Sequence, residues 1–283
     1  MKRRRRKKRS IKYVRLAVLL TILIVGVFVM IKGYEDYVKK MFRSKVKPEE
    51  VVALDIAKHQ YNWERLIEID GKRYYVYEDE SYSKFGIDVS KHQKHIDWKK
   101  VKDSGVEFAM IRLGHRGYES GAISLDPTFK YNLKEAMKQG IQVGVYFFSQ
   151  AITLEEAIEE AEFVLKHIKH YNLDFEIVFD MENIHGKTAR IDSLSNQQRT
   201  DFAIGFCQRV MAEDHKCMIY GNYHWLNGYF QLDRLANYPF WIAHYSDKLN
   251  FEYQLKMWQY TDSLTIDGIE GPVDANIYFD KEN

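Results

Sequence analysis

The chain has 283 residues, of which 46% are hydrophobic and 14% aromatic, so it is long enough to bury a sizeable core and its composition excludes a disordered protein. The formal net charge of +2 is unevenly distributed, because residues 1–32 hold eleven Lys and Arg and no acid, which leaves 31 basic against 40 acidic residues in the rest. Nucleic-acid binding needs basic residues clustered on the folded part, whereas the only dense basic cluster is the first nine residues. We therefore expect no nucleic-acid partner.

An uncharged run, LAVLLTILIVGVFVMI, occupies residues 16–31 behind a basic tail at residues 1–15. The run is long enough to span a bilayer, and the long side chains of Arg15 and Lys32 at its ends can reach the headgroups. No small-x-small cleavage site follows it, which favours an uncleaved signal anchor at residues 16–32 over a cleaved signal peptide. By the positive-inside rule we expect a single-pass protein of the cell membrane, with a cytoplasmic N-terminus and an extracellular body.

Residues 33–83 form a charged and aromatic segment, for which the simplest role is an extracellular stalk. Apolar positions between residues 34 and 61 suit a helix that is broken near Pro48. Residues 66–77 alternate around the Asp70-Gly71 pair, which predicts a small β-hairpin. Neither piece carries recognisable chemistry.

From residue 84 to residue 283 the pattern alternates between strand and helix. We expect strands at 85–89, 107–113, 141–148, 176–182, 217–221, 240–244, 255–260 and 273–279. Helix starts are predicted at Asp97, at Asp126-Pro127, and at the capping boxes Thr153-x-x-Glu156 and Ser195-x-x-Gln198. Eight strands of parallel type with about five helices indicate an α/β fold, a TIM-like barrel whose last third has lost helices.

In such barrels the active site forms at the carboxyl ends of the strands. That rule selects Asp88, Arg112, Phe148, Asp180, Glu182, Asn222, Tyr223, His244, Tyr245, Gln259, Tyr260 and Asp274. The set holds four acids, several aromatic residues and no evident nucleophile. Aromatic rings at a cleft mouth suit the apolar faces of sugars, and the candidates are Trp241, Tyr245, Trp258 and Tyr260.

Asp180 and Glu182 end the buried run that begins at Glu176. Because alternate residues of a strand share a face, the two carboxylates point the same way, roughly 6 to 7 Å apart. Their mutual repulsion raises the pKa of one, which leaves a proton donor beside a carboxylate. Glycoside cleavage needs that division of labour. An isolated Asp-x-Glu is also common in surface loops, so the pair does not define a site alone.

Two other chemistries receive less support. His92-x-x-His95 and His115 suggest a metal-dependent polysaccharide deacetylase, but no His-x-x-x-His or Cys-x-x-Cys supports a metal site, so we expect no metal and no cofactor. Ser-His-Asp catalysis lacks a Gly-x-Ser-x-Gly motif. Cys207 and Cys217 form either a disulfide, which export permits, or two buried thiols.

Residues 84–279, about two thirds of the chain, carry eight ordered motifs. They are GIDVS at 86–90, FAMIR at 108–112, GVYFF at 144–148, FDME at 179–182, IY at 219–220, FWIA at 240–243, MWQY at 257–260 and VDAN at 273–276. In these motifs the chain resembles the family 25 glycoside hydrolases, which are lysozymes of the N-acetylmuramidase type. The resemblance implies a barrel of eight strands and five helices, in agreement with the strand and helix pattern.

The resemblance also implies roles for individual residues. Glu182 is the expected general acid and Asp180 its partner carboxylate, while Asp88 and Asp274 complete the acidic cluster. Substrate-binding residues are expected at Arg112, Tyr146, Phe148, Tyr220, Trp241, Tyr245, Gln259 and Tyr260. Asp180 can activate water, attack the sugar, or orient the substrate's own acetamido group as nucleophile, and the short Asp-x-Glu spacing favours the third role.

The expected function is that of a membrane-anchored peptidoglycan hydrolase. It would cleave the β-1,4 bond between N-acetylmuramic acid and N-acetylglucosamine by general acid catalysis, with the glycan strands of peptidoglycan as its partner. The alternative is a non-catalytic glycan-binding or scaffolding protein of the cell wall that keeps the same barrel.

Overall fold

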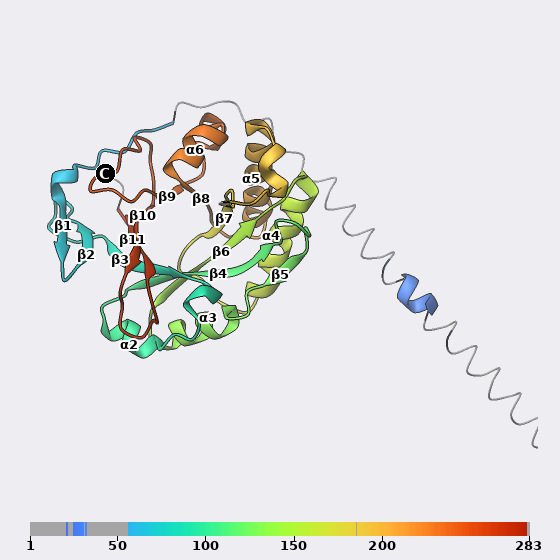
Figure 1. The fold of residues 1–283 in the computed structure, drawn as a ribbon, viewed down its shortest axis with the longest axis horizontal. Helices are drawn as coiled ribbons and strands as arrows, with labels where there is room; N and C mark the ends of the chain where they lie inside the picture. Colours follow the sequence, from blue (N-terminus) through green and yellow to red (C-terminus); the bar gives the residue numbers. More distant parts are fainter. Residues whose placement is uncertain (1–20, 22–24, 31, 33–55, 185, 282–283) are drawn as a thin grey trace, which may run out of the picture. The chain divides into compact units, whose positions relative to one another are not determined.

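The structure is a computed structural model that describes residues 21, 25–30, 32, 56–184 and 186–281 (Figure 1). The chain divides into two compact units, Met1–Glu49 and Glu50–Asn283. In the first unit the described residues are helical, and no helix among the residues that the structure describes is long and apolar enough to cross a membrane. The expected membrane span at 16–32 and the expected helix at 34–61 lie mostly outside the described residues.

Within the described part of the second unit, eight strands close a barrel (Figure 1). They are β3 (Lys84–Val89), β4 (Phe108–Arg116), β6 (Gln142–Ser149), β7 (Ile177–Met181), β8 (Cys217–Asn222), β9 (Phe240–Ala243), β10 (Met257–Leu264) and β11 (Val273–Tyr278). Each strand pairs with the next, and β3 closes the ring by pairing with both β4 and β11. A short additional strand, β5 (Ile123–Leu125), lies antiparallel to the end of β4. The predicted barrel is therefore confirmed.

The direction of the last strand differs from the prediction. The other seven barrel strands run parallel to one another, whereas β11 is antiparallel to both of its neighbours, β10 and β3. The expectation of eight parallel strands was wrong for β11, because β10 turns back directly into it without a crossover helix. As a result Asp274, near the start of β11, lies opposite Asp88, near the end of β3.

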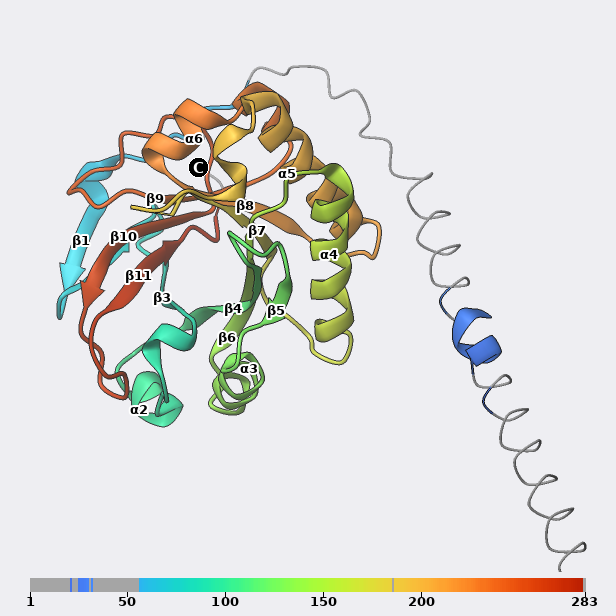
Figure 2. The ribbon, with the colours of Figure 1, turned by 45° about the vertical axis from the view of Figure 1, so that its right-hand side comes forward.

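The helices of the described second unit are α2 (Trp98–Asp103), α3 (Phe129–Lys138), α4 (Leu154–Ile168), α5 (Asn196–Met211) and α6 (Tyr223–Tyr229), with 3-10 turns η1 (Trp63–Arg65), η2 (Lys91–Gln93), η3 (Arg190–Ser193) and η4 (Leu232–Leu235). The side chains of Asp97, Thr153 and Ser195 accept hydrogen bonds from the backbone N–H groups at the starts of α2, α4 and α5, as predicted. Helices α3 and α4 pack outside β4 and β6 (Figure 2).

Two helix starts differ from the prediction. Helix α3 begins after Thr128, so its N-cap lies two residues beyond the expected Asp126. The Asp126 carboxylate instead forms an ion pair with Arg112 and accepts from the backbone N–H and the hydroxyl of Thr128. Helix α6, which the sequence pattern did not indicate, begins where the Asn222 side chain accepts from the backbone N–H of Trp225.

The lumen of the barrel is filled below its carboxyl end. A separate apolar cluster holds Phe108, Met110, Phe175, Val178, Met218, Trp241, Met257 and Tyr278. Glycines make room for it, because a Cβ at Gly86 would overlap the Phe108 ring and one at Gly144 would lie 2.6 Å from the Met110 Sδ. The carboxyl end of the lumen, beyond this cluster, is lined largely by polar side chains.

Residues 56–83, expected to belong to a stalk, pack against the barrel. The predicted hairpin is confirmed as β1 (Leu66–Ile69) and β2 (Lys72–Tyr75). Ahead of it, the Tyr61 ring stacks on Phe279 with centroids 4.3 Å apart, and the Trp63 ring meets Trp258 edge-on at 5.6 Å. Backbone hydrogen bonds also join residues 57–59 to residues 252–254. The compact unit thus begins at Glu50 and includes this segment.

The two cysteines are free and buried. Cys207 lies on α5 and Cys217 starts β8, and the Cys217 thiol donates to the Cys207 Sγ at 2.6 Å. Of the two alternatives that the sequence left open, the structure has two buried thiols.

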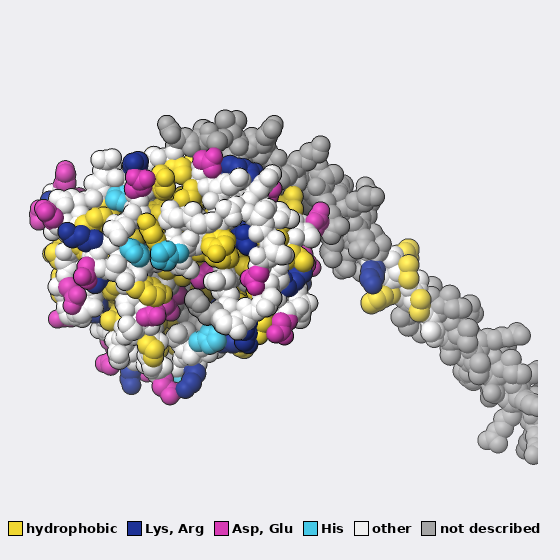
Figure 3. Space-filling view, turned by 45° about the horizontal axis from the view of Figure 1, so that its top comes forward, with side chains coloured by type: hydrophobic (Ala, Val, Ile, Leu, Met, Phe, Trp, Pro, Cys, Tyr) yellow, Lys and Arg dark blue, Asp and Glu magenta, His cyan; other side chains and the backbone are white. Residues whose placement is uncertain are grey.

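Acidic and basic side chains are interspersed on the face of the molecule that Figure 3 presents. Lys and Arg do not form a continuous surface on that face. The mixture agrees with the mildly acidic composition of the chain beyond residue 32.

Candidate active site

A pocket of about 150 Å³ opens at the carboxyl end of the parallel strands, and we call it the acid pocket. Its lining residues are Asp88, Tyr146, Asp180, Glu182, Tyr220, Trp241, Gln259 and Asp274. All four acids selected from the sequence therefore meet in one place. They come from β3, from β7 and the residue that follows it, and from β11, which are far apart in the sequence, and Asp274 reaches the pocket only because β11 is reversed.

Asp88 is held by two side-chain amides. Gln259 Nε2 and Asn276 Nδ2 each donate to Asp88 Oδ2 at 2.8 Å. The Trp241 Nε1–H donates in turn to Asn276 Oδ1 at 2.8 Å, which turns the amide nitrogen toward Asp88. Asn276 was not among the expected site residues, although the VDAN motif contains it.

The Gln259 amide is oriented by two phenols. The hydroxyl groups of Tyr220 and Tyr245 donate to Gln259 Oε1 at 3.1 and 2.9 Å. With its oxygen occupied in this way, Gln259 presents its N–H to Asp88. Tyr245 remains 52% exposed, so its ring stands at the rim of the acid pocket where a sugar can reach it.

Burial raises the pKa of every acid in the pocket. It raises the pKa of Asp88 to about 6 although the amides of Asn276 and Gln259 act to lower it. It raises the pKa of Glu182 to about 7, with a further contribution from the charge of Asp88. The pKa of Asp274 rises to about 8, again chiefly by burial and then by the charge of Asp88. The sequence predicted repulsion as the cause, whereas burial is the larger one.

Asp180 and Glu182 sit differently in the pocket. Asp180 is buried, and its Oδ1 has no hydrogen-bond partner among the described residues. Burial and the neighbouring Glu182 raise the pKa of Asp180 well above its ordinary value, and the nearby Arg112 guanidinium opposes that rise. Glu182 is partly exposed, while Met181 between them is fully buried on the opposite face. Asp180 thus lies deeper in the pocket than Glu182.

Tyr260 does not lie with the acids. Its hydroxyl accepts from the backbone N–H of Arg73 at 3.2 Å, and the Arg73 guanidinium lies 5.2 Å from its ring. Because Gln259 points into the lumen, its neighbours Trp258 and Tyr260 point outward, where residues 56–83 cover them. The expectation that Tyr260 binds substrate is therefore corrected.

Arg112 and Phe148 line a second cavity, of about 550 Å³, which we call the basic cavity. Its other lining residues are Lys91, His92, His115, Gly117, Tyr118, Glu119, Ser120, Asn183 and Ile184. His92 and His115, considered above for a metal, both line it, whereas the His95 ring lies against Tyr131. Among the residues described, no group of three or more His, Cys, Asp or Glu is placed to hold a metal ion.

The remaining strand-end residues lie farther round the rim. The Tyr223 ring stacks on His244 with centroids 4.9 Å apart, and Asn222 caps α6. Neither the stack nor the cap lines the acid pocket.

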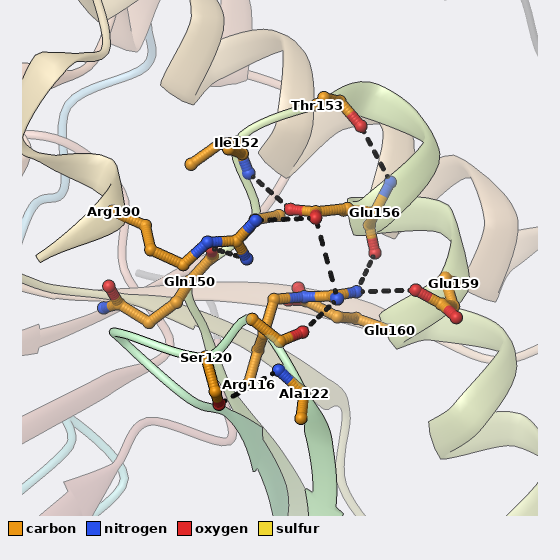
Figure 4. A network of polar contacts seen from close by, with 12 residues as sticks. Arg116, Ser120, Ala122, Gln150, Ile152, Thr153, Glu156, Glu159, Glu160 and Arg190 are labelled. Carbon is orange, nitrogen blue, oxygen red and sulfur yellow. Dashed lines mark hydrogen bonds and ion pairs between the residues drawn. The ribbon is translucent and has the colours of Figure 1, made fainter.

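A buried ion network supports the loops beside both cavities (Figure 4). Arg116 pairs with Glu160 at 2.7 Å and Glu159 at 2.9 Å on α4, and donates to the Gly121 carbonyl at 2.8 Å. Arg190, from the segment after β7, pairs with Glu156 at 2.8 Å and donates to the Gln150 carbonyl at 3.2 Å. The loop after β4 and the segment after β7 are thereby fixed to the same helix.

Gln150 links this network to the acid pocket. Its Nε2 donates to the Glu182 backbone carbonyl at 3.0 Å. The backbone at Glu182 is thus held by the residue that follows β6. Figure 4 shows Gln150 beside Arg190.

The protein is a closed α/β barrel, and four acids with raised pKa values meet at the carboxyl end of its strands. These two features are typical of barrel glycosidases that use carboxyl groups for catalysis. The comparison with known families agrees: residues 87–269 match the family model described as Glycosyl hydrolases family 25. The chain belongs to this family and is a glycosidase of the lysozyme, or muramidase, type.

Among its relatives, the chain is similar to the uncharacterized protein YegX of Escherichia coli K12. The two are 30% identical over 210 residues, a match that covers 70% of each chain. It is 29% identical over 194 residues to the autolytic lysozyme of Clostridium acetobutylicum, covering 68% of this chain and 54% of the relative. It is similar to the solved modular autolysin LytC of Streptococcus pneumoniae, with a TM-score of 0.63 and 28% identity over 76% of this chain and 52% of that one. The chain thus spans about half the length of the latter two.

Proposed function

We propose that the protein is a membrane-anchored peptidoglycan hydrolase that cleaves the β-1,4 bond between N-acetylmuramic acid and N-acetylglucosamine. The observation that carries the proposal is the acid pocket, in which Asp180 and Glu182 stand side by side among Asp88 and Asp274. The similarity to an autolytic lysozyme, and to an autolysin that has been solved with a synthetic peptidoglycan ligand, supports the choice of substrate.

Glu182 acts as the general acid. With a pKa of about 7 and a partly exposed carboxyl group, it is protonated in a large share of molecules near neutral pH and reaches the mouth of the pocket. It donates its proton to the glycosidic oxygen as the bond to the anomeric carbon breaks. Asp88, with a pKa of about 6, is largely ionised near neutral pH and places negative charge beside the positive charge that develops on the sugar ring, whereas Asp274, with a pKa of about 8, is largely protonated there.

Asp180 orients the substrate's acetamido group. Its buried Oδ1 makes no hydrogen bond within the described residues, so it is free to accept the acetamido N–H. The acetamido oxygen then attacks the anomeric carbon, and water opens the resulting ring with Glu182 as the base. This route retains the configuration at the anomeric carbon. If Asp180 activated water instead, the first product would be inverted, and NMR of the nascent anomer separates the two.

The test of the activity is digestion of purified peptidoglycan by the full chain. We expect new reducing ends at muramic acid, identified by borohydride reduction and mass spectrometry. Binding of the glycan without new reducing ends would support the non-catalytic alternative, and ends at N-acetylglucosamine would contradict the proposed bond specificity.

The membrane anchor is supported by the sequence of residues 1–32, with its basic tail and uncharged run. The anchor would hold an enzyme with a cytoplasmic N-terminus and an extracellular barrel near the wall. Protease added to intact cells stripped of their wall should remove the barrel. Protection of the barrel would overturn this orientation, and a mature N-terminus after Lys32 would show that the anchor is cleaved.

A further inference from the structure

We propose that the basic cavity is a carboxylate-binding subsite, which recognises the acidic substituent of the muramic acid beside the scissile bond. The inference rests on the proposed function and adds to it a determinant of substrate choice. The cavity is lined by Lys91, His92, Arg112 and His115, with Glu119 as the acid of its lining.

The basic cavity adjoins the acid pocket closely enough for one substrate to occupy both. Phe148, which lines the basic cavity, pairs in register with Asp180 on the neighbouring strand. Asn183, another lining residue, directly follows Glu182. The Arg112 guanidinium is near enough to Asp180 to act against the rise of its pKa. A group attached to the sugar in the acid pocket can therefore extend into the basic cavity.

The donors of the cavity suit an anion. His115 Nδ1 is buried and makes no hydrogen bond within the described residues. The pKa values of His92 and His115 are lowered by burial first and then by Arg112 and Lys91, which shows that both rings lie in a field of positive charge. A carboxylate that enters the cavity would partly neutralise this positive charge and accept hydrogen bonds from the ring N–H groups.

One buried acid arranges two of the cations. Asp126 pairs with Arg112 at 2.7 Å and also accepts from the backbone N–H of Lys91 at 3.1 Å. Arg112 is thereby held in place by an acid, whereas the Lys91 side chain stays exposed. Lys91 therefore supplies the positive charge whose flexible side chain can turn toward a ligand.

The walls are fixed in place before any ligand binds. On one side the Arg116 network of Figure 4 fastens the turn at residues 117–122 to α4. On the other side the Arg190 backbone N–H donates to the Tyr118 carbonyl at 3.2 Å, and Lys187 Nζ donates to the Tyr118 hydroxyl at 2.6 Å. A cavity of about 550 Å³ between such walls has room for a short peptide and not only for a small ion.

Two substituents of muramic acid carry the required carboxylate. In strands that carry stem peptides it belongs to the peptide, and in peptide-free strands it is the lactyl carboxylate itself. The test compares cleavage of peptide-bearing fragments, peptide-free fragments and the same two fragments after methyl esterification, using the full chain. We expect kcat/KM to fall by about 10-fold on esterification, the size of one charge-assisted hydrogen bond.

The variant that tests the subsite is Lys91→Gln, which keeps a polar, unbranched side chain and removes its charge. It should bring the carboxylate-to-ester ratio of kcat/KM close to one, while Lys130→Gln, a matched change at an exposed lysine of α3, should leave the ratio unchanged. If esterification slows cleavage of the peptide-bearing fragments, the recognised carboxylate belongs to the stem peptide. If it slows cleavage of the peptide-free fragments, the recognised carboxylate is the lactyl group.

Equal cleavage of acids and esters by the wild-type protein, or an undiminished ratio in Lys91→Gln, would overturn the subsite and leave the proposed hydrolase intact. Failure to cleave any of the fragments would instead count against the hydrolase, and the subsite would fall with it.

Discussion

Replacing Tyr75 by Ala tests whether residues 56–83 are an integral part of the barrel unit. Tyr75 on β2 is only 2% exposed, and its ring lies 5.1 Å from Tyr61, 5.4 Å from Tyr77 and 5.9 Å from Phe279. Truncating a buried aromatic side chain to Ala lowers the free energy of unfolding by about 3 to 5 kcal/mol. For a unit of this size that corresponds to a fall in Tm of about 6 to 20 °C.

The matched control is Tyr82→Ala, the same change at a tyrosine that is 52% exposed. It should alter the free energy of unfolding by about 0.5 kcal/mol or less. Thermal unfolding of the full chain followed by circular dichroism measures both variants. If Tyr75→Ala shifts the Tm no more than Tyr82→Ala, residues 56–83 are a detachable stalk and the reasoning is refuted.

The remaining predictions concern pH and metal. Because burial raises the folded-state pKa of Glu182 to about 7, above its ordinary 4.5, the protonated form stabilises the fold. That stability is fully present below about pH 4.5 and is lost as the pH rises through about 7, so Glu182→Gln should be more stable than the parent to urea at pH 8 and similar at pH 4. Equal stability of the two at pH 8 would contradict the cause given for the pKa. Exhaustive chelation should leave glycan cleavage unchanged, because the proposed steps need only carboxyl groups; loss of activity that zinc restores would favour a metal-dependent mechanism.

The sequence predicted the barrel, the hairpin and three helix caps, because these features depend on local periodicity and on short capping patterns. The reversal of β11 could not be predicted in the same way, because the residue pattern of a short strand such as VDANIY does not show whether it pairs parallel or antiparallel with its neighbours. Asp274 was nevertheless selected, first among the strand-end residues and then through the VDAN motif.

Tyr260 shows an error that the sequence itself could have prevented. In MWQY the side chains alternate faces, so Gln259 and Tyr260 cannot both enter the lumen of a regular strand. The aromatic content of residues 56–83 was a second overlooked signal, because rings such as Tyr61 and Trp63 require a surface to pack on, and Phe279 and Trp258 provide it.

Burial of the four acids could not be read from the sequence. Their pKa values depend on how the lumen is filled beneath them and on the amides around Asp88, which are properties of the assembled barrel. Asn276 is an example, because its role follows from two hydrogen bonds, to Asp88 and from Trp241.

The central claim is that Glu182 supplies the proton that breaks the glycosidic bond. Glu182→Gln keeps the size of the side chain but cannot donate a proton as an acid, so kcat for the release of muramic acid reducing ends should fall by roughly 10² to 10⁴. Met181→Leu, at the buried neighbour that faces away from the pocket, should leave kcat almost unchanged. With circular dichroism showing both variants folded, a kcat of Glu182→Gln equal to that of the parent would contradict the account.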